Sequence, residues 1–214
     1  RGGLRAQHVL DELDRLTESR GVIATDVGQH QMWAAQFCKS SRERQWISSG
    51  GAGTMGYGLP AALGAQFGCP ADLVIAVVGD GGFQMTQFEL ATAAIHKLPV
   101  KILVINNNYL GMVRQWQQLF FDNRESGVDM EGNPDFVKLA EAYGIKSFRI
   151  RRAGDVTRVL KKALDYNDGP VLIDAEVVKA DNVFPMIPSG APVADMLIEE
   201  PPRTTKLEKP VGST

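Results

Sequence analysis

Apolar and polar positions alternate along this chain in a pattern that is typical of strands separated by helices. Short apolar runs predict six strands, at 22–25, 45–48, 73–78, 100–106, 146–150 and 171–177. Segments with helical spacing or many alanines predict helices at 4–19, 32–38, 61–67, 86–97, 109–121, 135–143 and 155–166. This alternation favours an α/β fold, in which an open six-stranded parallel sheet carries helices on both faces.

The same pattern divides the chain into a folded domain and a tail. We expect the domain to span residues 1–181, with Pro134 at the first position of the sixth helix. Prolines and the loss of apolar periodicity predict an extended tail over 182–214, and we expect its last stretch, 203–214, to be disordered. The start, Arg1-Gly2-Gly3, has no initiating Met, which suggests a piece of a longer chain.

Composition narrows the class of protein. The 214 residues are 44% hydrophobic and 22% charged, with a formal net charge of -2, which is ordinary for a globular domain and gives no support for nucleic acid or a membrane as partner. No apolar run is long enough to span a bilayer. Cys38 and Cys69 lack metal-ligand spacing, so we expect buried free thiols. Without a targeting segment, we expect a cytoplasmic protein, with an organelle left open.

The most specific chemical pattern lies at the ends of two predicted strands. Gly79-Asp80-Gly81 follows the third strand, and Asn106-Asn107 closes the fourth about two dozen residues later. Parallel strands end at one edge of a sheet, where the ligand crevice lies. A carboxylate and an amide oxygen would meet there, and such hard oxygens suit Mg²⁺ together with phosphate. An ordinary βαβ unit with a tight first turn is the alternative.

This spacing resembles the thiamine diphosphate (ThDP) motif, in which GDG is followed by about two dozen residues and NN. Four further segments are similar to the catalytic subunit of acetohydroxyacid synthases, also called acetolactate synthases: GQHQMW at 28–33, GTMGYGLP at 53–60, LGMVRQW at 110–116 and PMIPSG at 185–190. The resemblance runs from the first helix to about Leu197. It corresponds to that family's C-terminal third, the diphosphate-binding domain, without the pyrimidine-binding and FAD-holding domains.

The resemblance implies a set of metal and cofactor residues. The side chains of Asp80 and Asn107 and the main-chain carbonyl of Tyr109 would coordinate Mg²⁺, with two diphosphate oxygens and a water completing the octahedron. The cofactor-binding residues would be Gly28, Gln29, His30, Gly53, Met55, Asp80, Gly81, Gly82 and Asn107. Outside this context, a lone histidine such as His30 would be interpreted as a solvated loop residue.

Three further positions acquire a role only through the resemblance. Met55 would wedge under ThDP and bend it, which brings the pyrimidine amino group to the reactive thiazolium carbon; core packing is the alternative. Met112 and Trp116 lie four apart on one helix face, which would line the substrate channel and favour 2-ketobutyrate over pyruvate. Helical spacing alone would indicate core packing. Pro188 and Ser189 would belong to a lid over the active site.

The resemblance implies a transferase that depends on ThDP and Mg²⁺. It would decarboxylate pyruvate and join the two-carbon unit to pyruvate or 2-ketobutyrate, giving 2-acetolactate or 2-aceto-2-hydroxybutyrate for branched-chain amino acid biosynthesis. FAD would belong to the parent enzyme. The catalytic glutamate would come from the pyrimidine-binding domain of a second subunit in a homodimer or tetramer, so we expect this chain alone to be inactive. A regulatory small subunit is a possible further partner.

Other functions share part of the pattern. Pyruvate oxidases and 2-keto acid decarboxylases carry the metal motif, but we would not expect them to share the segments 110–116 and 185–190. A non-catalytic interaction module would use the glycine-rich edge as a subunit interface. A nicotinamide-binding domain is disfavoured, because no G-x-G-x-x-G follows the first strand.

Overall fold

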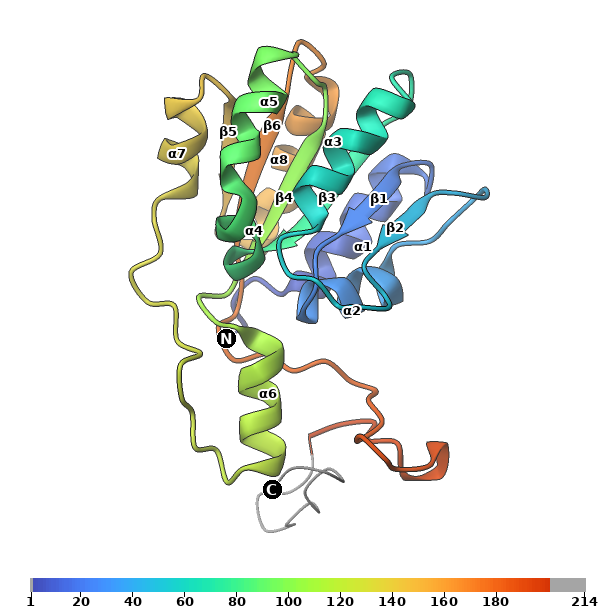
Figure 1. Cartoon of the computed structure of the whole chain (residues 1–214), viewed down its shortest axis with the longest axis vertical. Helices are drawn as coiled ribbons and strands as arrows, with labels where there is room; N and C mark the ends of the chain where they lie inside the picture. Colours follow the sequence, from blue (N-terminus) through green and yellow to red (C-terminus); the bar gives the residue numbers. More distant parts are fainter. Residues whose placement is uncertain (1, 201–214) are drawn as a thin grey trace.

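A single parallel sheet organises residues 2–200, which the computed structural model describes (Figure 1). Its strands are β1 (Val22–Thr25), β2 (Trp46–Ser48), β3 (Val74–Gly79), β4 (Lys101–Asn106), β5 (Lys146–Ile150) and β6 (Val171–Glu176). They lie in the order β2-β1-β3-β4-β6-β5, and every neighbouring pair is parallel. The prediction of an open six-stranded parallel sheet is therefore confirmed.

Helices cover both faces of this sheet, as predicted. One face carries α1 (Ala6–Thr17), α2 (Gln29–Phe37) and α8 (Val156–Asp165); the other carries α3 (Gly58–Gly68), α4 (Asp80–Thr86), α5 (Leu90–Ile95) and α7 (Phe136–Ala142). Short 3-10 turns occupy Gln87–Glu89, Ala153–Asp155 and Val193–Asp195. Side chains of β3 alternate between the two cores: Ile75 and Val77 enter one, Val74 and Ala76 the other. This burial on both faces explains the continuous apolar runs of the central strands.

One helix stands apart from these two layers. In Figure 1, α6 (Gly111–Phe120) lies beyond the carboxyl edge of the sheet, below it in this view, between the loop 121–135 and the tail. The tail does not simply extend: Met186 and Leu197 exchange two backbone hydrogen bonds of 2.9 and 2.8 Å, so the segment between them folds back. The stretch predicted to be disordered, 203–214, lies outside the described residues.

Several helices begin elsewhere than predicted, and two of these differences have a clear local cause. The segment after β3 is helical from Asp80, not from residue 86, because Gly79 is still extended and serves as the N-cap of α4. An acidic residue in the first turn also suits the helix dipole. Pro134 does not begin α7. Asp135 is the N-cap instead, since its Oδ1 accepts hydrogen bonds from the N–H groups of Val137 and Lys138.

The prediction of buried thiols is only partly right. Both cysteines are free, but Cys69 is exposed, because it is the C-cap of α3 at the surface. Cys38 is half-buried against α1, and burial raises the pKa of its thiol to about 12. Within residues 2–200, no helix is long and apolar enough to cross a membrane.

Candidate cofactor and metal site

The site lies at the point where the order of the strands reverses. From β1 the chain passes to β2 on one side and then returns to β3 on the other, and ligands of such sheets bind outside the carboxyl ends at this point. The loops after β1, β2, β3 and β4 line a cavity of about 260 Å³ here. Its lining includes every residue predicted for the cofactor and metal: Gly28, Gln29, His30, Gly53, Met55, Asp80, Gly81, Gly82, Asn107 and Tyr109.

Asp80 brings a nearly buried carboxylate to this cavity. It is 1% exposed, and burial raises its pKa to about 6, although Asn133 Nδ2 donates a 2.7 Å hydrogen bond to Oδ2. Among the described residues, no salt bridge joins it to a cationic side chain. A buried carboxylate is costly unless a cation compensates it. The position therefore fits a bound metal ion.

Asn107 supplies an amide oxygen from the neighbouring loop. Its Oδ1 accepts a 3.0 Å hydrogen bond from the N–H of Tyr109, and its Nδ2 donates to Gln29. Asn108 has a φ of 54°, a left-handed conformation that asparagine tolerates, and it turns the chain between β4 and α6. In the described part of the chain, no three acidic, histidine or cysteine side chains could hold a metal. The donor set is thus a partial oxygen shell, as Mg²⁺ shared with a phosphate group requires.

The start of α2 provides the groups that suit an anion. Gly28, at φ 149°, precedes the helix and offers no side-chain cap, so the first N–H groups stay available. His30 in this turn is 6% exposed, and its Nε2 is buried without a hydrogen-bond partner. Burial lowers its pKa to about 4, although Asp26 acts in the opposite direction. A neutral imidazole with an unpartnered nitrogen fits a diphosphate oxygen.

Met55 is half-buried and also lines the cavity, in a loop shaped by glycines. Gly53 and Gly56 have φ values of 63° and 87°, which L side chains rarely adopt. The carboxylate of Asp26 accepts hydrogen bonds from the N–H groups of Gly56 and Gly58, at 3.1 and 2.8 Å. This contact anchors the loop at the residue next to Met55.

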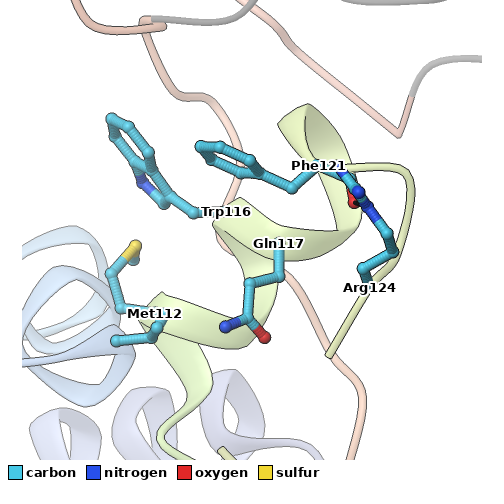
Figure 2. Close-up of a pocket in the computed structure, with 6 residues that line it drawn as sticks. Met112, Trp116, Gln117, Phe121 and Arg124 are labelled. Carbon is cyan, nitrogen blue, oxygen red and sulfur yellow. Dashed lines mark hydrogen bonds between the residues drawn. The ribbon is translucent and has the colours of Figure 1, made fainter. Parts of the chain in front are cut away.

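A second, larger hollow of about 640 Å³ lies over the outer side of α6. Figure 2 shows the rings of Trp116 and Phe121 on the same side of the helix, with Met112 one turn before Trp116. Met112 and Val113 line both hollows. Met112 and Trp116 thus share one face, as predicted. Ser189 is exposed and lines neither hollow, so this structure does not bring it to the site.

Residues 26–175 match the family described as "Thiamine pyrophosphate enzyme, C-terminal TPP binding domain". The chain belongs to this family. Its matched segment begins at the end of β1 and reaches into β6, so it contains the four loops of the cavity.

Relatives of this TPP-binding domain are acetolactate synthases. The chain is 50% identical over 201 residues to the "Acetolactate synthase large subunit" of Pyropia yezoensis, covering 93% of this chain and 34% of the relative. It is 47% identical over 193 residues to the "Acetolactate synthase" of Mycobacterium bovis, covering 88% and 31%. With "Acetolactate synthase 1, chloroplastic" of Nicotiana tabacum it shares 43% over 200 residues, covering 90% and 30%. The chain spans about a third of these relatives, and the resemblance drawn from its motifs is confirmed.

The structure adds residues to this TPP-binding domain that sequence reasoning missed. Asn133 donates to Asp80 and, at 3.0 Å, to Asn108, so it ties the loops after β3 and β4 together. It lies in a polar loop without a local signal. Asp26 is completely buried directly after β1. An acidic residue between a strand and a glycine-containing loop could have indicated such a site residue from the sequence. A Cβ at Gly82 would stand 2.1 Å from Asp26 Oδ1, so that glycine admits the carboxylate.

Proposed function

We propose that this chain is the diphosphate-binding part of an acetolactate synthase. The observation that carries the proposal is the cavity where Asp80, Asn107, His30 and Met55 gather, in a chain that is 43–50% identical to proteins of that name. Bound there, ThDP supplies the electron sink for decarboxylating a 2-keto acid and for carboligation to a second one. The products would be 2-acetolactate and 2-aceto-2-hydroxybutyrate, precursors of branched-chain amino acids.

The side chains would divide the work of binding. Oxygens of Asp80 and Asn107, with the carbonyl of Tyr109, would hold Mg²⁺ against the diphosphate. His30 would place its unpartnered Nε2 against a phosphate oxygen and would donate an N–H there when that nitrogen carries a proton. Met55 would support the bent cofactor, because an apolar, adaptable side chain fits an irregular wall.

The remaining parts of the enzyme would come from outside this chain. We propose that a pyrimidine-binding domain of a second subunit supplies the catalytic glutamate, in a homodimer or tetramer, and that FAD is bound by another domain. A regulatory small subunit is a further proposed partner. The tail beyond Asp181 would contribute the lid.

The test is acetolactate formation from pyruvate with ThDP and Mg²⁺. We expect activity from a longer protein that contains this chain together with its pyrimidine-binding domain. We expect little or none from the 214-residue chain. Release of acetaldehyde or acetate in place of acetolactate would move the function to a decarboxylase or an oxidase. If the isolated chain formed acetolactate as fast as the longer protein, the pyrimidine-binding domain would not be needed, and this part of the proposal would be contradicted.

Substituting Trp116 should change which second substrate is used. Trp116→Leu removes the ring that packs edge-on against Phe120 at a centroid distance of 5.3 Å, and so opens the apolar wall of α6. A pocket discriminates one methylene by only about 1–3 kcal/mol. We expect the preference for 2-ketobutyrate over pyruvate to fall about tenfold or more, within that range, while the pyruvate rate changes less. Product ratios in mixed-substrate assays measure this, and an unchanged ratio would remove Trp116 from the pocket.

A further inference from the structure

The tail docks on α6 through Gln115, whose side-chain amide pairs with both the N–H and the carbonyl of one tail residue. Gln115 is completely buried, and its Nε2 donates to the carbonyl of Val183 at 2.9 Å while its Oε1 accepts from the N–H of Val183 at 2.8 Å. Nε2 also donates to Met186 Sδ at 3.1 Å. A backbone peptide cannot exchange its donor with its acceptor, so Val183 fixes which end of the Gln115 amide carries the oxygen.

A second amide continues the same network toward the cofactor cavity. Gln29 Nε2 donates to Gln115 Oε1 and to the carbonyl of Asp181, both at 2.9 Å. Its Oε1 accepts from Asn107 Nδ2 at 3.3 Å. Gln29 is 3% exposed, and its contacts with Gln115 and Asn107 are buried, while the contact with Asp181 is partly buried. Gln115 Oε1 and the Asp181 carbonyl are both acceptors, so they must face the NH₂ group of Gln29. The oxygen of Gln29 therefore faces Asn107.

Asn107 is the third amide and lies at the end of the network. Gln29 presents it with an oxygen, so Asn107 must turn its Nδ2 there and its Oδ1 the other way, toward the N–H of Tyr109. The Oδ1 atom has two lone pairs, and only one is used by that N–H. The other is left for a metal ion, in the cavity that also contains Asp80.

We propose that Gln115 and Gln29 are positioning residues for Asn107. The Val183 peptide fixes the orientation of the Gln115 amide, Gln115 fixes that of the Gln29 amide, and Gln29 fixes that of the Asn107 amide, so that the Asn107 oxygen faces the metal. This inference rests on the proposed metal site. A flipped amide at any step would oppose two donors or two acceptors in a buried place, which is costly. Binding of Mg²⁺ at Asn107 and docking of the tail at Val183 therefore favour one another, because such coupling is reciprocal.

The test compares two substitutions of Gln115 in the 214-residue chain. Gln115→Leu keeps most of the volume but removes one of the two acceptors that orient Gln29; the other, the Asp181 carbonyl, belongs to the tail that Gln115 holds at Val183. We expect the Asn107 side-chain amide signals in a ¹H–¹⁵N spectrum to move, and Mg²⁺ affinity in the presence of ThDP to fall about 10-fold or more by calorimetry, as for other outer partners of metal ligands. Gln115→Glu keeps an oxygen for Gln29 and for the Val183 N–H, but it turns a second oxygen toward the Val183 carbonyl. Both readouts should therefore lie between those of Gln115→Leu and the wild type.

The control is Gln36→Ala, which removes an exposed contact of 3.2 Å to the tail carbonyl of Phe184 but lies outside the amide network. It should change neither readout. Unmoved Asn107 signals or wild-type affinity in a folded Gln115→Leu would overturn the proposal, and so would an equal loss in Gln115→Glu. If Gln115→Leu does not fold, hydrogen exchange of the wild-type Val183 amide decides: Mg²⁺ with ThDP should slow it, and no slowing would overturn the coupling.

Failure of the proposed function gives a different result. Wild-type chain that binds no Mg²⁺ with ThDP would contradict the cofactor site itself. The Asn107 amide signals can be recorded without cofactor, so their response to Gln115→Leu and Gln115→Glu would still decide whether the amide network has the direction described.

Discussion

Asp80→Ala in a longer, active protein should lower acetolactate formation by more than about 100-fold, beyond the usual cost of losing only an outer partner of a metal ligand. Asp80 is the one carboxylate among the proposed metal donors, and its carboxylate has no salt-bridge partner among the described residues. Without its charge, the cavity retains only neutral oxygens for Mg²⁺, which binds reluctantly without carboxylates. Activity and the Mg²⁺ concentration for half-maximal ThDP binding measure the effect.

The same substitution should not unfold the metal-free domain. Burial raises the pKa of Asp80 above its usual value, so ionisation of this carboxyl costs the folded state more than the unfolded state. The wild type therefore loses stability as pH rises from the unfolded value near 4 to about 6, and Asp80→Ala should lack this loss. Asp168→Ala, an exposed aspartate before β6, is the matched control. An active, Mg²⁺-dependent Asp80→Ala enzyme would contradict the metal assignment.

Much of the fold and part of the site follow from local pattern. Central strands buried on both faces must be apolar throughout, so β3 and β4 are evident in the sequence, and their carboxyl ends must share an edge. That reasoning places Asp80 and Asn107 together without tertiary information. It fails where two signals compete at one place: the glycines after β3 suggested a turn, although Asp80 already begins α4.

The supporting residues of the site could not be predicted in this way. Asn133 contacts Asp80 across 53 positions, and Gln115 contacts Val183 across 68. Polar loop residues and helix glutamines carry no periodic signal for such partners. The amide orientations depend on the tail, whose docking is a tertiary event that its prolines do not indicate. The site thus combines motif residues set by strand ends with partners that only the folded chain brings together.

Asp26→Ala should be the most destabilising single substitution near the cavity. Asp26 is completely buried, and its carboxylate accepts three backbone N–H groups, those of Val27 at 2.9 Å, Gly56 at 3.1 Å and Gly58 at 2.8 Å. Each buried donor left without a partner costs about 1–3 kcal/mol. We expect the free energy of unfolding to fall by about 3 kcal/mol or more, a large share of the ~5–15 kcal/mol of a typical domain.

Urea unfolding followed by far-UV circular dichroism measures this loss, with two comparison variants. Asp129→Ala removes an exposed carboxylate that pairs with Lys179 at 3.0 Å, and it should leave the midpoint unchanged. Asp26→Asn keeps one carbonyl oxygen but turns an NH₂ group toward N–H donors, so its midpoint should lie between those of Asp26→Ala and the wild type. A wild-type midpoint for Asp26→Ala would show that the loop of Met55 is held by something else. A graded loss, with ThDP binding weakened in the same order, would identify this carboxylate as the anchor that holds Met55 against the cavity.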